Sequence, residues 1–263
     1  ALDRRDAMSG RETIVYDKRG HVATLALNRP QARNGIVPKM MDELWEAVQD
    51  AAADEQLRVL VLRGVGRDFC PGADVKAYAA GQEPTRPETF NVSVLLHEAP
   101  IVTIAAIRGA CAGAGFGWAT ACDLRICDET ARFNTAFLDV AMSGDMGGSW
   151  FLPRILGAAK ARELYFLPGK FDAAEAARIG LVNKVTSEAE FEVELTALTD
   201  RLANASPLAL KGMKANFVDS ERMGLTDFIA AETARHTACG RSEDSREAFR
   251  AFVEKRRPVF QGR

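Results

Sequence analysis

Long apolar runs and an excess of charge of either sign are both missing from this sequence. Its longest apolar stretch, residues 101–107, has the length of a strand and is far too short to span a membrane. The 34 basic and 36 acidic residues leave a net charge of −2, and no block of like charges marks a surface for nucleic acid. We therefore expect neither a membrane nor a nucleic-acid partner.

Cysteine and histidine are scarce. The five cysteines form no CxxC pair, and no histidine lies near Cys122 and Cys127 to complete a metal site. We expect buried free thiols in a reducing cytoplasm and no bound metal. The start of the chain lacks the charged and apolar segments of a secretion signal, so the expected location is cytoplasmic. Residues 1–7 are expected to be leader or added sequence, with Met8 as a candidate natural start.

Strand and helix patterns alternate in the first half of the chain. The 263 residues, 47% hydrophobic and 27% charged, have the composition of an ordinary globular protein with one large core. Apolar runs at Val22–Leu27, 59–62 and 101–107 predict strands, the last two buried on both faces. Residues Pro38–Ala53 predict an amphipathic helix that begins at a proline.

The second half changes character after Ile155. Six stretches have helical patterns, and only residues 181–185 between them look extended. These stretches are residues 163–167, 173–179, 188–202, 208–219, 225–237 and 245–255. We predict an α/β core over residues 8–200 and a helical region over residues 201–263. Helices in such an appendage need a partner surface, so this region is expected to make the protein an oligomer.

Two strand–loop units share a pattern. Arg63-Gly64 and Arg108-Gly109 each follow a predicted strand, and each leads to a glycine–alanine pair, Gly72-Ala73 or Gly113-Ala114. A repeat of strand, loop and helix is typical of a coiled α/β core whose turns stack on one another. Chance recurrence within an α/β protein is the alternative interpretation.

Both glycine loops precede a helical pattern. The first N–H groups of a helix have no partner within it, and the helix dipole favours negative charge there. Two such groups directed at one point form an oxyanion hole, in which each donor contributes about 100- to 1000-fold in rate. A dinucleotide site is the alternative for the second loop, because Gly113, Gly115 and Gly117 give GxGxG. That fingerprint, however, requires a small residue where Trp118 stands.

Six segments in order carry a family resemblance, and they extend from about Ile14 to the end of the chain. They are 27–30 (LNRP) with 34–35 (NG), 69–74 (FCPGAD), 109–115 (GACAGAG) with 121–123 (ACD), 147–148 (GG), 173–182, and 252–258 (FVEKRRP). These segments resemble the enoyl-CoA hydratase/isomerase (crotonase) family. The resemblance implies an α/β fold, namely a spiral of ββα turns followed by a helical C-terminal trimerisation domain, with trimers usually paired into hexamers.

The resemblance also implies a substrate, a coenzyme A thioester. Its carbonyl would be polarised by the N–H groups of Ala73 and Ala114, with Gly72, Asp74 and Gly113 beside it. Coenzyme A is part of the substrate, so no separate cofactor is expected. Two further residues are implied at the end of the chain, where Phe252 and Lys255 would reach the adenosine of coenzyme A on a neighbouring subunit. An aromatic ring beside basic residues suits that role, and a packed ring on a solvated helix end is the alternative.

The sequence departs from the family at two positions. Family hydratases carry two pocket glutamates, and the matching positions here hold Gly117 and Phe137, neither of which can move a proton. Adding water to a double bond generally requires one group that takes a proton and one that gives it. Ordinary hydration is therefore not expected, and Phe137 is expected to form part of the substrate pocket.

Asp145 is the carboxylate that remains in a suitable place. Its position matches that of the proton-moving aspartate of dienoyl-CoA isomerases in this family, and of the nucleophilic aspartate of its aryl-CoA dehalogenases. Set among Met142, Met146, Trp150 and Phe137, its carboxyl should lose hydration and have a raised pKa. A simple turn in a glycine-rich loop is the alternative.

The sequence thus predicts an acyl-CoA enzyme that stabilises a thioester enolate and uses Asp145 as acid and base. Double-bond isomerisation or a nonstandard hydration is the first hypothesis. Hydrolysis or dehalogenation through a nucleophilic Asp145 is the second, and a non-catalytic acyl-CoA binding protein is the third. Among other polar residues, Asp123 is expected to be structural, and His97 is expected to cap a helix or lie on the surface.

Overall fold

A six-stranded sheet forms the centre of the computed structural model, which describes residues 10–263. The prediction for residues 1–7 and Met8 lies outside the described residues. The strands lie in the order β1-β2-β3-β4-β6-β9; β1 is antiparallel to β2, and the other neighbours are parallel. Their bounds are β1 (Ile14–Arg19), β2 (Val22–Leu27), β3 (Val59–Gly64), β4 (Val102–Ile107), β6 (Leu124–Asp128) and β9 (Lys184–Thr186). The mixed α/β class predicted from the sequence is confirmed.

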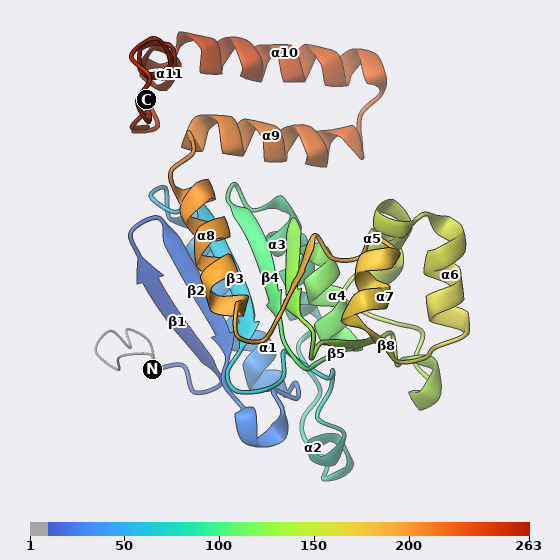
Figure 1. Ribbon diagram of the computed structural model, residues 1–263. Helices are drawn as coiled ribbons and strands as arrows, with labels where there is room; N and C mark the ends of the chain where they lie inside the picture. Colours follow the sequence, from blue (N-terminus) through green and yellow to red (C-terminus); the bar gives the residue numbers. More distant parts are fainter. Residues whose placement is uncertain (1–9) are drawn as a thin grey trace.

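A second sheet and the helices complete the fold (Figure 1). The second sheet contains β5 (Ala110–Ala112), β7 (Arg132–Asn134) and β8 (Phe171–Asp172). The α-helices are α1 (Pro38–Ala53), α2 (Val75–Ala79), α3 (Val92–Glu98), α4 (Ala114–Ala121), α5 (Gly148–Leu156), α6 (Ala158–Phe166), α7 (Ala173–Arg178), α8 (Phe191–Ala203), α9 (Pro207–Ser220), α10 (Leu225–Arg241) and α11 (Glu243–Val253). Short 3-10 helices lie at η2 (Pro30–Ala32), η3 (Pro87–Asn91) and η4 (Leu138–Val140).

The large sheet is covered on both faces, which explains its continuous apolar strands. Leu60 and Leu62 of β3 point into the main core, which also contains the apolar face of α1. Val59 and Val61 point to the opposite face, where they pack with Phe191 of α8. Parallel strands with both faces buried have no polar alternation, so the apolar runs identified these strands correctly.

The turns of the chain stack beside one another through isolated parallel bridges. Ile36 pairs with Ala73, and Cys70 pairs with Cys111. Strand β5 continues this stack by pairing with β7. Each turn of the chain is therefore aligned with the next by backbone hydrogen bonds, and β3 and β4 of the two repeated units lie side by side.

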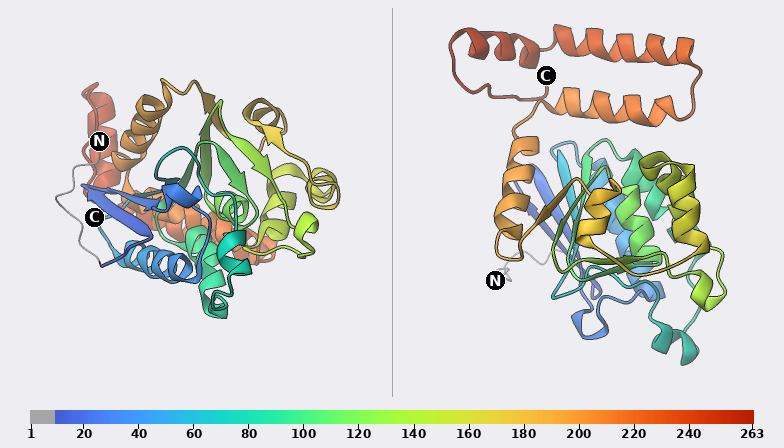
Figure 2. Two further views of the ribbon diagram at one scale, coloured as in Figure 1. Left: turned by 90° about the horizontal axis from the view of Figure 1, so that it is seen from below. Right: turned by 45° about the vertical axis from the view of Figure 1, so that its right-hand side comes forward.

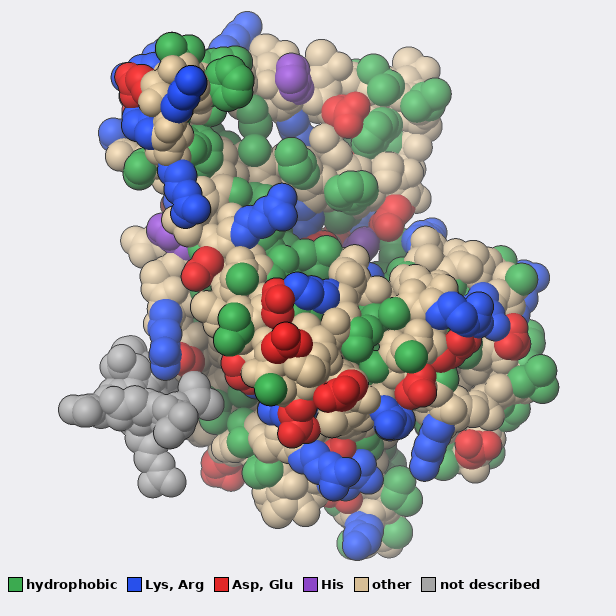
Figure 3. Space-filling model, in the orientation of Figure 1, with side chains coloured by type: hydrophobic (Ala, Val, Ile, Leu, Met, Phe, Trp, Pro, Cys, Tyr) green, Lys and Arg blue, Asp and Glu red, His purple; other side chains and the backbone are tan. Residues whose placement is uncertain are grey.

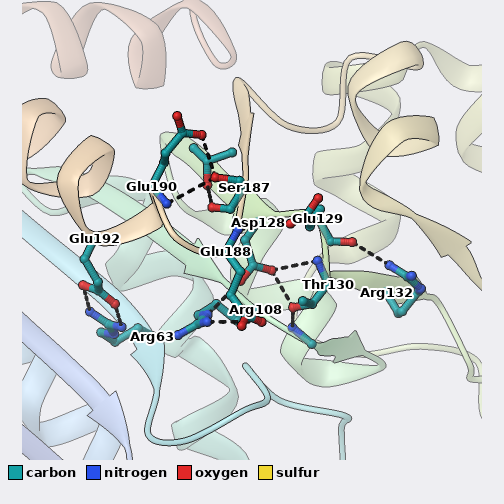
Figure 4. Close-up of polar contacts among 12 residues, drawn as sticks. Arg63, Arg108, Asp128, Glu129, Thr130, Arg132, Ser187, Glu188, Glu190 and Glu192 are labelled. Carbon is teal, nitrogen blue, oxygen red and sulfur yellow. Dashed lines mark hydrogen bonds and ion pairs between the residues drawn. The ribbon is translucent and has the colours of Figure 1, made fainter.

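Helix α8 is attached to the sheet by charged side chains (Figure 4). Arg63 of β3 pairs with Glu192 through both of its terminal nitrogens. Arg108, just after β4, donates a 2.8 Å bond to Asp128 and lies 3.5 Å from Glu188. These pairs connect two neighbouring strands to the loop and helix that cover their outer face.

Helix α9 is fixed to the spiral by one buried lysine. Lys214 is 6% exposed, and its Nζ donates to the carbonyl oxygens of Leu96 and Ile101 at 3.0 and 2.9 Å and to Asp123 Oδ2 at 2.8 Å. The same carboxylate oxygen accepts the backbone N–H of Thr103 at 2.7 Å. Asp123 therefore has the structural role expected for it.

Arg58 connects the start of β3 to the end of the chain. Its guanidinium donates to the carbonyl oxygens of Ala203, Ala205 and Phe260 at 2.7, 3.0 and 3.0 Å. The side chain is 8% exposed, because it lies between the sheet and the C-terminal segments. This single residue satisfies carbonyl groups at the end of α8, in the connection to α9, and near the C-terminus.

The C-terminal helices α9–α11 extend away from the sheet and carry exposed apolar side chains (Figures 1 and 3). Their exposed large hydrophobic residues are Met213, Phe217, Leu225, Ile229, Phe249, Phe252 and Val253. No helix within residues 10–263 is long and apolar enough to cross a membrane. The boundary at residue 200, inside α8, and the oligomerising role of the helices after it remain predictions.

We expect Lys214→Met to lower the free energy of unfolding by about 3 kcal/mol, because it leaves the partly buried Asp123 carboxylate without its cation. It also removes a donor from the carbonyl groups of Leu96 and Ile101, of which Leu96 keeps the Thr103 hydroxyl. The measurement is urea unfolding at fixed protein concentration. Lys211→Met, on the same helix, is the control and should change the free energy by less than about 0.5 kcal/mol. Equal losses for the two variants would contradict the assigned role of Lys214.

Candidate active site

Two glycine loops pack directly against each other at the carboxyl ends of the central strands. A Cβ atom at Gly72 would lie 3.3 Å from the carbonyl oxygen of Ala112 and 3.7 Å from the backbone nitrogen of Ala114. A Cβ atom at Gly113 would lie 3.5 Å from Gly72 Cα. Both residues have positive φ, 99° and 53°, a region that side chains disfavour. Glycine at both positions therefore allows main chain to lie against main chain.

This packing places the backbone nitrogen of Ala114 close to the loop that carries Ala73. The bridge to Ile36 uses the residues on either side of Ala73: Gly72 accepts from Ile36 and Asp74 donates to Ile36, both at 2.9 Å. The N–H of Ala73 is not used by this bridge, and Ala114 is the first residue of α4, where the N–H has no partner within the helix. Within residues 10–263 neither group donates a loop or cap hydrogen bond. Both N–H groups are thus left without a loop or cap partner, and the oxyanion hole expected from the sequence remains a prediction.

Asp74 holds the first loop in place. Its Oδ1 accepts the N–H of Ala77 at 3.1 Å and caps α2, while Oδ2 accepts from Arg29 at 2.9 Å. The cap and the guanidinium both lower the pKa of this carboxyl. The visible role of Asp74 is structural, and its contact with a substrate remains a prediction.

Gly117 lies on α4, against the loop that carries Asp145. A Cβ atom at Gly117 would lie only 2.6 Å from Met146 Cβ and 3.5 Å from the carbonyl oxygen of Asp145. The loop has left-handed backbone at Gly144, Met146 and Gly147, with φ of 108°, 52° and 72°. The absence of a side chain at Gly117 thus makes room for a tightly turned segment that approaches α4 closely. Non-glycine residues with positive φ often cluster at functional sites.

The Asp145 side chain is half-buried, and one of its two carboxyl oxygens is buried without a partner. Its Oδ1 is inaccessible and has no hydrogen bond, and burial raises the pKa of the group to about 6. Met146 and Phe137 supply apolar surroundings, as the sequence predicted, whereas Met142 is 63% exposed and contributes little. A carboxyl with a pKa near neutrality can both accept and return a proton.

Tyr165 of α6 also lies at this site, although no sequence pattern indicated it. Its hydroxyl oxygen is buried without a hydrogen bond, and burial together with the charge of Asp145 raises its pKa to about 12. Its ring stacks on Phe137 with the centroids 6.1 Å apart and the planes 10° from parallel. The signal in the sequence was weak: a single tyrosine on a short helix, twenty residues after Asp145.

A cavity of about 500 Å³ lies beside the same loop. Met146 and Gly147 line it, together with the side chains Phe90, Ser93, His97, Trp150, Phe151 and Glu221. His97 was expected to cap a helix or lie on the surface. Its side chain is instead 17% exposed, bonded through Nε2 to Glu221 at 2.8 Å, and packed edge-on against Trp150. The cavity reaches Met146, next to Asp145 in the chain, and its aromatic walls suit an apolar acyl or aryl group, although Glu98, Glu221 and Arg222 also line it.

Phe252 and Lys255 lie far from the loops within one chain. Phe252 lies in the last turn of α11 and is 84% exposed, and Lys255 follows the end of the helix by two residues. Figures 1 and 2 place α11 and α2 at opposite ends of the molecule. Their expected role on a neighbouring subunit remains a prediction. Residues 10–263 contain no cluster of side chains suited to hold a metal ion.

Comparison with known proteins places this geometry in a family. The family model described as enoyl-CoA hydratase/isomerase matches residues 17–263. A probable enoyl-CoA hydratase of Rhodobacter capsulatus is 34% identical over 95% of this chain and 98% of its own length. The enoyl-CoA hydratase structure from Bacillus anthracis superposes with a TM-score of 0.90 at 28% identity, covering 96% of this chain and all of that one.

A third similar protein was solved with a ligand. The Thermobifida fusca protein in complex with acetoacetyl-CoA has a TM-score of 0.80 at 29% identity, covering 86% of this chain and 94% of its own. The family match spans both glycine loops and the Asp145 loop. The chain belongs to the enoyl-CoA hydratase/isomerase family.

Proposed function

We propose that this protein binds an acyl-CoA thioester, stabilises its enolate, and uses Asp145 to move a proton between carbon atoms of the acyl chain. The observation that supports this most strongly is a half-buried carboxyl, one oxygen of which is buried without a partner, on a loop that contacts α4 at Gly117. The first residue of the same helix, Ala114, supplies one of the two free N–H groups. The acetoacetyl-CoA complex of the similar Thermobifida fusca protein supports the substrate class.

The two N–H groups stabilise the negative charge that develops on the thioester oxygen during the reaction. A thioester carbonyl seated between Ala73 and Ala114 accepts both hydrogen bonds. When a proton leaves carbon, charge accumulates on the carbonyl oxygen, and fixed donors stabilise it without reorganisation. The dipole of α4 adds to this effect, because its positive end is at Ala114. In double-bond isomerisation Asp145 takes a proton from one carbon and returns it at another. In hydration it would instead take a proton from the attacking water and give it to C2 of the enolate.

Two other chemistries use the same groups. A nucleophilic Asp145 would attack the bound acyl or aryl group and form a covalent adduct, giving hydrolysis or dehalogenation. A binding protein would keep the N–H groups and have no use for Asp145. The raised pKa of Asp145 favours proton transfer, because a general acid/base works best with a pKa near the working pH.

We further propose that the active unit is a homotrimer or a hexamer in the cytoplasm. The exposed apolar side chains of α9–α11 need a covering surface, and a neighbouring subunit provides one. In such an assembly Phe252 and Lys255 would stack on the adenine and pair with a phosphate of coenzyme A bound to the next subunit.

Asp145→Asn should keep the shape and the acyl-CoA affinity but lose about 100- to 10,000-fold in kcat, the usual contribution of a general acid/base. In the wild type kcat/KM should fall as the pH drops below about 6, because protonation removes the base. The test is a pH–rate profile with α-proton exchange on a saturated acyl-CoA in deuterated water. A mass increase on the quenched protein would instead indicate a nucleophile, and no exchange by the wild type would exclude the proposed chemistry.

Ala114→Pro should lower kcat by about 100- to 1000-fold, because it deletes one oxyanion donor. Proline is tolerated at the first position of a helix, where its missing N–H breaks no intrahelical bond, so α4 should persist in the circular dichroism spectrum. Affinity for coenzyme A without an acyl group should change little. An unchanged kcat would remove Ala114 from the proposed oxyanion hole.

A further inference from the structure

Two polar atoms that are buried without hydrogen-bond partners lie at the Asp145 loop. They are Asp145 Oδ1 and the hydroxyl oxygen of Tyr165. Buried side-chain polar atoms in folded proteins are almost always hydrogen-bonded, and leaving one unpaired costs about 1–3 kcal/mol. Two such atoms in one site, one an acceptor and the other a donor, therefore point to a small polar molecule that bonds to both.

The packing around Tyr165 places its hydroxyl within the Asp145 loop. A Cβ atom at Gly148 would lie 2.2 Å from this oxygen, and one at Gly144 would lie 3.2 Å from the ring carbon Cε1. The glycines on both sides of Asp145 thus make room for the tyrosine. The backbone N–H of Gly148 also donates to the carbonyl oxygen of Asp145 at 3.3 Å, so the same short segment carries the carboxyl and receives the hydroxyl. Helices α5 and α6, which follow it, lie side by side (Figure 1).

The ionisation states of the two groups are complementary. A pKa of about 12 keeps the Tyr165 hydroxyl protonated at neutral pH, so it remains a hydrogen-bond donor. A pKa of about 6 leaves Asp145 mostly ionised, so it is an acceptor. Phe137 stacks along the tyrosine ring and contributes an apolar wall. A water molecule that accepts from Tyr165 and donates to Asp145 would satisfy both unpaired atoms.

We propose that Tyr165 and Asp145 together hold the water that adds to C3 of a 2-enoyl-CoA, so that this protein is a hydratase whose water-binding pair is a tyrosine and an aspartate. This rests on the proposed function, because it requires the thioester enolate and Asp145 as the proton carrier. It goes further in assigning a role to Tyr165 and in selecting hydration over isomerisation.

The step balances with these groups alone. The water oxygen bonds to C3, and the electron pair of the C2–C3 double bond moves into the thioester to form the enolate. One water proton passes to Asp145 and the other stays on the new C3 hydroxyl. Asp145 then gives its proton to C2, the enolate collapses to the thioester, and the carboxylate is restored. Tyr165 keeps its own proton and donates one hydrogen bond to the oxygen, leaving a lone pair directed at C3.

In the proposal, hydration requires the Tyr165 hydroxyl and enolisation does not, so the two reactions can be used as a test. Removing the C2 proton of a saturated acyl-CoA requires the N–H groups and Asp145 but no water. The variant is Tyr165→Phe, which keeps the ring against Phe137 and removes one oxygen atom. Tyr16→Phe is the matched control, because Tyr16 lies on β1 and takes no part in the site.

Hydration is measured as loss of enone absorbance with crotonyl-, octenoyl- and cinnamoyl-CoA. Enolisation is measured by deuterium exchange into butyryl-CoA. We expect Tyr165→Phe to lose at least about 100-fold in kcat for hydration, while KM and exchange change by less than about threefold. Tyr16→Phe should match the wild type in both reactions.

The remaining outcomes distinguish a failure of the water-binding role of Tyr165 from a failure of the proposed enolate chemistry. Equal loss of hydration and exchange in Tyr165→Phe would overturn the water-binding role, because the tyrosine would then only support Asp145. Undiminished hydration in this variant would overturn it as well. Exchange without hydration of any enoyl-CoA by the wild type would overturn the proposal and leave the enolate chemistry intact. Absence of exchange in the wild type would overturn the proposed function itself.

Discussion

The contact between Gly72 and Gly113 is the constraint on which the rest of the site depends. Two loops from successive turns of the spiral meet backbone to backbone, and the φ values of 99° and 53° are ones that glycine adopts readily. The bridge to Ile36 fixes the first loop, and the hydrogen bond from Gly113 N–H to the carbonyl oxygen of Asn134 at 3.2 Å fixes the second. That bond also sets where β7 ends, and hence where Phe137 can stack.

Strands and helices with a regular apolar pattern could be predicted from the sequence. Strands that bury a charged residue, or that are only three residues long, could not. Strand β2 and helix α1 have the bounds expected from their apolar patterns. Strand β6 was missed because it contains Arg125, which is 7% exposed and satisfied by carbonyl oxygens, including that of Leu181 at 2.7 Å. Three-residue strands such as β5 and β7 are too short for any periodicity to show. They exist because neighbouring turns of the spiral align them.

The candidate site was likewise predictable only in part from the sequence. Local composition was enough to predict free N–H groups after glycine loops, and it placed Asp145 in apolar surroundings. It could not show that Tyr165 lies beside Asp145, because that contact joins a loop to the helix after next. Nor could it show that Gly117 is needed for the approach of Met146. A glycine leaves no periodic pattern in the sequence, so its role becomes visible only from the residues that pack against it.

The hydrogen bond from Arg58 to Phe260 has a consequence for the order of events during protein synthesis. During synthesis the chain leaves the ribosome from its N-terminus at about 5–20 residues per second. Phe260, one of the residues that Arg58 binds, follows it by 202 positions, which corresponds to a delay of roughly 10–40 s. Through that interval the guanidinium at the start of β3 lacks its final partner. The hydrogen bond that joins the start of β3 to the segment after α11 can therefore form only after Phe260 has been synthesised, well after the strands of the central sheet.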